Sequence, residues 1–291
     1  MRPVHRRVGP VYSDRMYRPR RSVLFLPASN PRAIEKARSL ACDVVVLDLE
    51  DAVAPEAKRE ARIAAVEAAR AGGFGGRELV VRANGLDTAW GADDLAALAD
   101  APVDAVLVPK VSRAEEVARA RAAVAKPVWA MIETCRALLA LREIVEAGPA
   151  ALVAGTNDLS KEMRCRPGAD RAPLVPLLAQ IIVAARAAGL AAIDGVSNAI
   201  DDPAAVEREA MQGLQLGFDG KSLIHPSQID PANRVFTPSA DEVAWAETVA
   251  AAFALPENAG RGAIRVEGRM VELLHLEEAR RVLAVAGSKL G

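Results

Sequence analysis

Eight short apolar runs, separated by longer alanine-rich stretches, constrain the fold of this chain more than any other feature. The runs are rich in Val, Leu and Ile without polar alternation, which is typical of strands buried on both faces in parallel βαβ units. Eight such units in about 200 residues predict an α/β fold of the (β/α)₈ TIM barrel type. The expected strands are Ser22–Leu26, Asp43–Leu49, Glu78–Ala83, Asp104–Pro109, Val128–Ile132, Ala150–Ala154, Leu190–Ile193 and Gln215–Phe218.

The stretches between the runs have the residue spacing of amphipathic helices, as a barrel requires. A doubly wound open sheet is the alternative fold, but no G-x-G-x-x-G motif follows an early strand. We therefore favour the barrel. The clearest expected helices are Pro31–Leu40, Pro55–Arg70, Ala114–Ala125 and Val175–Gly189.

Three parts are expected along the chain. Residues 1–20 hold six arginines, one aspartate and no apolar core, which predicts a flexible extension, with an Arg-rich targeting segment as the alternative. Residues 21–238 form the predicted barrel with its site. Residues 239–291 are expected to add helices that act as a lid or contact a neighbouring subunit.

Within the C-terminal part, two stretches have helical character, Ala240–Ala254 and Leu276–Ser288. The segment between them, Ala259–Glu272, contains three glycines. Glycine lowers the propensity for regular structure, so we expect a flexible loop there.

The composition disfavours several kinds of partner. Lys and Arg number 37 against 38 Asp and Glu, so no global charge attracts nucleic acid or a membrane surface. No stretch has eighteen uninterrupted apolar residues, and no membrane span is expected. Cys42, Cys135 and Cys165 form neither an even set nor a C-x-x-C pair, which favours a reducing, cytoplasmic location. Cys135 is interpreted as a small helix residue rather than a nucleophile.

Polar residues directly follow almost every predicted strand. The carboxyl ends of barrel strands are where catalytic groups lie, so these residues are the candidates for a site. They are Ser29–Asn30, Asp48–Asp51, Arg82–Asn84, Lys110, Glu133, Asp158, Asp194 and Asp219–Lys221.

Among these residues, Glu133 and Asp158 are the candidates for a metal site. They follow adjacent predicted strands, so their carboxylates are expected to leave the barrel at the same end. Mg²⁺ is commonly held by one or two carboxylates and keeps water or substrate oxygens in its other positions. The alternative is that each carboxylate caps the helix that follows it.

Two cations follow the third and fourth strands. Arg82 is suited to pair with a carboxylate or a developing oxyanion, with a salt bridge to the acidic cluster Asp48–Asp51 as the alternative. Lys110 would be the nucleophile if the chain formed a Schiff base. Nearby carboxylates favour a protonated lysine, so we interpret Lys110 as an ion-pair partner.

Nine motifs occur in order between about Arg20 and Val285: RRSVLFLPASNPRAIEKA, VVVLDLEDAVAPEAKREAR, VVRANG, VLVPKV, MIET, GTNDL, AIDGV, GFDGKSLIHPSQI and EGRMVE. Together they resemble the citrate lyase β-subunit-like (HpcH/HpaI aldolase/citrate lyase) family, which includes malyl-CoA and citramalyl-CoA lyases. The resemblance implies a barrel with C-terminal helices that assembles as a homotrimer or homohexamer.

The resemblance also implies roles for residues at the strand ends. Mg²⁺, with Mn²⁺ as a substitute, would be held by Glu133 and Asp158. Substrate would be bound through Arg82 and through main-chain amides at Thr156 and Asn157. For catalysis, the resemblance implies that Arg82 would stabilise the oxyanion, while Asp48 and Glu50 would orient the metal's waters.

The resemblance extends to coenzyme A and to a distant carboxylate. Phe25 and Lys36 match positions that contact coenzyme A in relatives, and Arg32 is expected to replace an arginine that is Asn30 here. The lyases present a catalytic aspartate, in a motif like M-I-D-x-P, to the neighbouring subunit's site. This chain has Glu272 at that position and lacks the proline.

We therefore expect a Mg²⁺-dependent carbon–carbon lyase. It would cleave a 3-hydroxyacyl-CoA dicarboxylate, such as malyl-, methylmalyl- or citramalyl-CoA, into an acyl-CoA and a 2-oxo acid. The alternatives are the citryl-thioester lyase subunit of a citrate lyase complex, a malyl-CoA thioesterase and a non-enzymatic scaffold that binds coenzyme A or a dicarboxylate.

Overall fold

The computed structural model describes residues 18–287. They divide into two compact units: Arg20–Thr237, and residues 238–287 together with residues 18–19. Each unit is described by itself. Most of the expected N-terminal extension, residues 1–17, lies outside the described residues.

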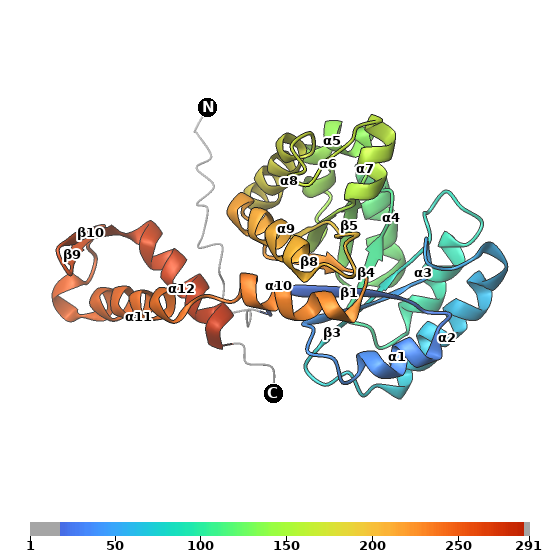
Figure 1. The fold of residues 1–291 in the computed structure, drawn as a ribbon, viewed down its shortest axis with the longest axis horizontal. Helices are drawn as coiled ribbons and strands as arrows, with labels where there is room; N and C mark the ends of the chain where they lie inside the picture. The colour runs from blue at the N-terminus through green and yellow to red at the C-terminus, as the bar shows by residue number, and fades with distance from the viewer. Residues whose placement is uncertain (1–17, 288–291) are drawn as a thin grey trace, which may run out of the picture. The chain divides into compact units, whose positions relative to one another are not determined.

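The first unit is built on a closed barrel of eight parallel strands, and the predicted fold is confirmed (Figure 1). Each strand pairs with the next in the sequence, and β8 closes the barrel on β1 through the pairs Ser22↔Lys221 and Leu24↔Leu223. The strands are β1 Ser22–Pro27, β2 Val44–Asp48, β3 Glu78–Arg82, β4 Ala105–Val108, β5 Val128–Ile132, β6 Ala151–Ala154, β7 Ala191–Asp194 and β8 Gly220–Leu223.

Successive residues of the strands face two different apolar layers. In β1, Val23 and Phe25 pack inside the barrel, while Leu24 and Leu26 pack outward against the helices. Both faces are therefore buried, which is why the runs show no polar alternation. The helices of this unit are α1 Pro31–Ala37, α2 Lys58–Ala71, α3 Gly91–Ala99, α4 Ala114–Val124, α5 Cys135–Leu139, α6 Leu141–Glu146, α7 Thr156–Met163, α8 Val175–Ala187, α9 Pro203–Leu216 and α10 Ile229–Phe236, with 3₁₀ turns at Pro55–Ala57 and Pro226–Gln228.

The predicted eighth strand, Gln215–Phe218, is wrong. Helix α9 continues to Leu216, and Gly217 ends it in the left-handed region with φ +106°. The eighth strand is Gly220–Leu223, whose middle residues Lys221 and Ser222 are polar and fully buried. Because an ion pair with Asp194 accounts for the buried Lys221, an apolar pattern could not reveal this strand. Asp219 consequently precedes the strand instead of following it, and pairs with Arg186.

The second unit contains two packed helices, α11 Ala240–Ala254 and α12 Leu273–Gly287, and a 3₁₀ turn at Pro256–Asn258. The flexible loop expected between them is instead an antiparallel hairpin, β9 Ala263–Val266 and β10 Arg269–Glu272. Ile264, Val266 and Val271 of the hairpin join the apolar core of α11 and α12, which stabilises it. The glycine in its turn, Gly268, has φ +83°.

Among the described residues, no helix combines the length and apolar character needed to cross a membrane.

Candidate active site

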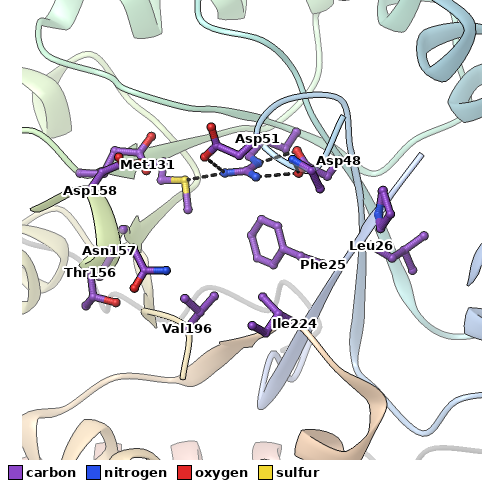
Figure 2. Close-up of a pocket in the computed structure, with 16 residues that line it drawn as sticks. Phe25, Leu26, Asp48, Asp51, Met131, Thr156, Asn157, Asp158, Val196 and Ile224 are labelled. Carbon is purple, nitrogen blue, oxygen red and sulfur yellow. Dashed lines mark hydrogen bonds and ion pairs between the residues drawn. The ribbon is translucent and has the colours of Figure 1, made fainter. Parts of the chain in front are cut away.

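A cavity of about 340 Å³ opens at the carboxyl ends of the barrel strands. Figure 2 shows the acidic side chains Asp48, Asp51 and Asp158 along one side and the apolar Val196 and Ile224 along the other. The lining residues are Phe25, Leu26, Pro27, Asp48, Asp51, Ala52, Arg82, Met131, Glu133, Ala154, Gly155, Thr156, Asn157, Asp158, Val196 and Ile224. The cavity therefore lies where the strand-end residues were expected to meet.

Arg82 is buried at the end of β3 and faces the acidic cluster. Its guanidinium donates two hydrogen bonds to the carboxylate of Asp48, at 2.6 Å and 2.7 Å, and Nη1 lies 2.9 Å from Oε2 of Glu50. The ring of Phe25 lies beneath it, 5.3 Å from Cζ. Burial lowers the pKa of Arg82, but the attraction of Asp48 and Glu50 outweighs that effect, and the pKa stays above its ordinary value. Arg82 is thus a permanently charged donor whose orientation is set before any ligand arrives.

Two other cations hold the acidic loop that follows β2. Lys58 is buried and donates to the main-chain carbonyls of Leu49 and Glu50, at 2.8 Å and 2.7 Å. Lys110 pairs with the carboxylate of Glu50. The role of Lys58 was missed from sequence, because nothing in its helical position signals that it reaches back to the loop.

The surroundings of Lys110 disfavour the role of a Schiff-base nucleophile. Its partial burial lowers the pKa of the ammonium, but the hydrogen bond to Glu50 raises it more, so the net pKa lies above the ordinary value. A lysine that keeps its proton is a poor nucleophile. Its backbone amide donates to Oε1 of Glu133 at 2.7 Å.

Glu133 and Asp158 line the same cavity, as expected for a metal site. Neither caps a helix by a side-chain hydrogen bond: Thr134 caps α5, and α7 has no side-chain cap. Glu133 is 2% exposed, and burial raises the pKa of its carboxyl group to about 7. Gly155 packs so closely that an added Cβ would lie 2.5 Å from Oε2 of Glu133.

The donor set fits a hard divalent cation. Two carboxylates face one cavity, and in residues 18–287 no group of three or more His, Cys, Asp or Glu side chains converges to enclose an ion. A cation held by Glu133 and Asp158 would therefore keep positions for water or ligand oxygens, which is the usual arrangement for Mg²⁺.

The remaining predicted residues fall into two groups. Phe25, Thr156 and Asn157 line the cavity, whereas Arg32 and Lys36 lie exposed on α1 and do not line it. Asn30 caps α1 by accepting from the amide of Ala33 at 3.1 Å. Glu272 lies exposed in the second unit, at the end of β10.

Cys135 does not have the surroundings of a nucleophile. Its partial burial and the neighbouring Glu162 raise the pKa of the thiol. The reactive form of cysteine is the thiolate, so the raised pKa makes Cys135 less reactive than an ordinary cysteine near neutral pH.

Comparison with known proteins agrees with the resemblance found in the sequence. The HpcH/HpaI aldolase/citrate lyase family profile matches residues 21–226. A (3S)-malyl-CoA thioesterase of Cereibacter sphaeroides is 46% identical, with 92% of this chain and 95% of that protein covered. Citrate lyase subunit beta of Leuconostoc mesenteroides is 34% identical, with 92% and 94% covered.

Among solved structures, CitE of Mycobacterium tuberculosis is similar over 92% of this chain and 98% of its own, with a TM-score of 0.74 and 34% identity. That protein was crystallised in complex with magnesium, acetoacetate and coenzyme A.

Proposed function

This chain belongs to the HpcH/HpaI aldolase/citrate lyase family, whose members include lyases and related enzymes that process coenzyme A thioesters, and we propose that it is a Mg²⁺-dependent thioester hydrolase acting on a hydroxy-dicarboxylate thioester such as malyl-CoA. The observation that carries the proposal is the 46% identity to a (3S)-malyl-CoA thioesterase over nearly the whole of both chains. The citrate lyase subunit shares 34%.

The cavity supports a role for Mg²⁺ and for a dicarboxylate. Glu133 and Asp158 would hold the ion, which when bound supplies Lewis-acid polarisation of a ligand oxygen. The amino-terminal end of α7, at Thr156 and Asn157, offers main-chain amides to a carboxylate. Arg82 holds Asp48 in place and Lys110 holds Glu50 in place, and the two carboxylates would orient water.

In hydrolysis, the oxygen of a water molecule attacks the thioester carbonyl carbon and gives up a proton. The carbon–sulfur bond breaks, and the sulfur leaves as a thiolate that takes up a proton. Arg82 would stabilise the negative charge that develops on the carbonyl oxygen, because its guanidinium is already oriented by Asp48. The products are free coenzyme A and a hydroxy-dicarboxylate.

Carbon–carbon cleavage is the second candidate, and the likeness to citrate lyase subunit beta and to CitE with bound acetoacetate favours it. A hydroxyacyl thioester would lose its hydroxyl proton, break the carbon–carbon bond and release a thioester enolate that an acid protonates. Glu272 would be that acid, one methylene longer than the aspartate of the lyases. The reaction rate falls steeply when a catalytic group is displaced. The longer side chain of Glu272 is such a displacement, so we place this activity second.

Purified protein with Mg²⁺ and malyl-, methylmalyl-, citramalyl- and citryl-CoA distinguishes the two. Free thiol would be followed with a disulfide reagent, and 2-oxo acid with a carbonyl-trapping reagent. We expect metal-dependent thiol release without oxo acid. Oxo acid without thiol would replace the hydrolase by the lyase. If neither free thiol nor 2-oxo acid forms from any of the four thioesters, both proposed activities are withdrawn.

Binding of coenzyme A, assembly and location are also proposed. Phe25 lines the cavity, and the exposed Lys36 and Arg32 on α1 carry charges suited to the phosphates of coenzyme A. The family resemblance implies a homotrimer or homohexamer. Association of copies is supported by Leu139 and Val183, which are 90% and 69% exposed beside one apolar groove lined by α5, α6 and α8. Light scattering would measure the mass.

A cytoplasmic location is supported by the three free cysteines. Fractionation of cells that express the tagged chain would test it.

A further inference from the structure

The connection between β7 and α9 forms part of the cavity wall through Val196, yet residues 195–202 have no regular secondary structure. Such a loop needs other partners for its main-chain carbonyls. Four of them accept hydrogen bonds from side chains of the single segment 221–228. These bonds are Lys221 Nζ to Gly195 O at 2.7 Å, Gln228 Nε2 to Ser197 O at 3.0 Å and to Ala199 O at 3.1 Å, and Ser227 Oγ to Ile200 O at 3.0 Å.

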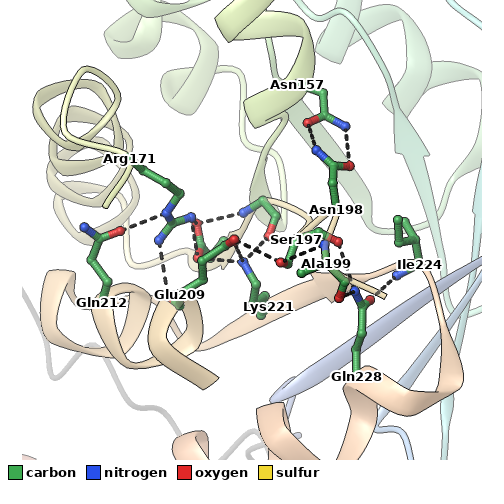
Figure 3. A network of polar contacts seen from close by, with 12 residues as sticks. Asn157, Arg171, Ser197, Asn198, Ala199, Glu209, Gln212, Lys221, Ile224 and Gln228 are labelled. Atoms are coloured by element: carbon green, nitrogen blue, oxygen red, sulfur yellow. Dashed lines mark hydrogen bonds and ion pairs between the residues drawn. The ribbon is translucent and has the colours of Figure 1, made fainter. Parts of the chain in front are cut away.

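Gln228 makes two of these four bonds (Figure 3). Its side chain is fully buried. While Nε2 donates to the loop, Oε1 accepts from the amides of Ile224 and His225, at 2.8 Å and 3.3 Å. One amide group therefore joins the loop that carries Val196 to the segment that carries Ile224, the two residues of the apolar wall.

A second contact ties the same loop to α7. Asn198 and Asn157 exchange two side-chain hydrogen bonds, at 3.2 Å and 2.9 Å. Gly195 passes so close to Thr156 that an added Cβ would lie 2.4 Å from its hydroxyl oxygen. The loop is thus held on both sides.

We propose that Gln228 is a positioning residue that sets the spacing of Val196 and Ile224, and thereby the size of the substituent that the cavity accepts on the acyl chain. This inference rests on the proposed function, because it takes the ligand to be a hydroxy-dicarboxylate. The carboxylates of such a ligand would face Arg82, Glu133 with its cation, and α7. Its carbon skeleton would then lie against the apolar wall.

Three variants test the inference. Gln228→Glu keeps an acceptor for Ile224 and His225 but removes the amide donor to the loop. Val196→Ala enlarges the wall without touching the buried network. Gln212→Glu is the matched control: it keeps the acceptor for Nε of Arg171, at 2.8 Å, and removes the amide donor to the main-chain carbonyl of Asp170, which does not line the cavity.

The first readout needs no ligand. Hydrogen exchange by mass spectrometry should show that Gln228→Glu raises exchange of the 195–202 peptide by about five-fold or more, since local opening is no longer opposed by the amide donor. The 223–228 peptide should stay unchanged, and so should both peptides in Gln212→Glu. Equal exchange of the 195–202 peptide in the wild type and Gln228→Glu would overturn the inference.

The second readout is the ratio of dissociation constants for malate and citramalate, which differ by one methyl group, measured by calorimetry with Mg²⁺. Gln228→Glu and Val196→Ala should each shift the ratio toward citramalate by about ten-fold, at the lower end of the range that one methyl group contributes to discrimination. Gln212→Glu should not shift it.

An unchanged ratio in Val196→Ala, or an equal loss for both acids in Gln228→Glu, would overturn the role in specificity. If the wild type binds neither acid, that role is overturned as well. If it binds both acids but releases no thiol from malyl-CoA, the hydrolase proposal fails, while the two readouts still decide the role of Gln228.

Discussion

The backbone amide of Lys110 donates to Oε1 of Glu133 at 2.7 Å, and Lys110 makes this bond from the left-handed region of the backbone, with φ +52°. A residue with a side chain adopts that conformation at a cost, and such positions cluster at functional sites. The bond orients one oxygen of Glu133 and leaves the other directed toward Gly155.

Replacing Lys110 tests the backbone conformation. Lys110→Gly and Lys110→Val both lose the ion pair with Glu50, but only glycine adopts φ +52° without steric cost. We expect the glycine variant to be more stable than the valine variant by about 1 kcal/mol in urea unfolding. Equal stability would show that the left-handed backbone carries no cost here.

Replacing the two candidate metal ligands tests the cation site. Glu133→Gln and Asp158→Asn each remove one carboxylate, and we expect Mg²⁺ affinity by calorimetry to fall by about 100-fold or more, since even outer-shell changes cost 10–100-fold. Glu146→Gln, in an exposed pair with Arg142, is the control. Unchanged Mg²⁺ affinity in either cavity variant would exclude that residue as a ligand.

Arg82→Lys tests the guanidinium. The variant keeps the charge but loses the two-pronged bond to Asp48, so we expect a stability loss of about 1–3 kcal/mol and a fall in turnover of about 100-fold. Arg62→Lys is the matched control, because Arg62 pairs with the buried Asp94 outside the cavity. A similar loss of stability in both variants with equal turnover would assign Arg82 a structural role only.

The thiol of Cys42 provides a prediction about pH. Cys42 is fully buried, and burial raises the pKa of its thiol from 9.0 to about 11. The protonated form thus favours the fold, and this contribution is present below pH 9 and lost as the pH rises toward 11. At pH 8 we expect iodoacetamide to label Cys165 in the folded protein, and to label Cys42 only in denaturant. Labelling of native Cys42 at the rate of Cys165 would contradict its burial.

Glu272→Gln tests the carboxylate of the second unit. The family resemblance assigns an acid or base to this position, and the attacking water of hydrolysis must give up a proton, so we expect thiol release to fall by about 10-fold or more while Mg²⁺ affinity stays unchanged. Glu267→Gln, in the turn of the same hairpin, is the control. Full activity of Glu272→Gln would remove Glu272 from the chemistry.

The sequence by itself determined the barrel and most of the cavity. Seven of the eight strands lie where their apolar runs predicted, since a strand buried on both faces has a local signature. Arg82 ends one such strand, and Glu133 and Asp158 follow two others, so barrel geometry alone places them at one end. The finer choice, hydrolysis or carbon–carbon cleavage, does not follow from those residues, because both reactions need the same cation and the same oxyanion partner.

Only the tertiary structure decided the eighth strand and the apolar wall. Lys221 is polar in sequence and fully buried in the fold, because Asp194 and Glu209 come from other elements to pair with it. Gln228 likewise joins Val196 and Ile224 across the β7–α9 and β8–α10 connections. Buried polar groups require partners that lie far away in the chain, and such pairing leaves no periodic pattern in the sequence.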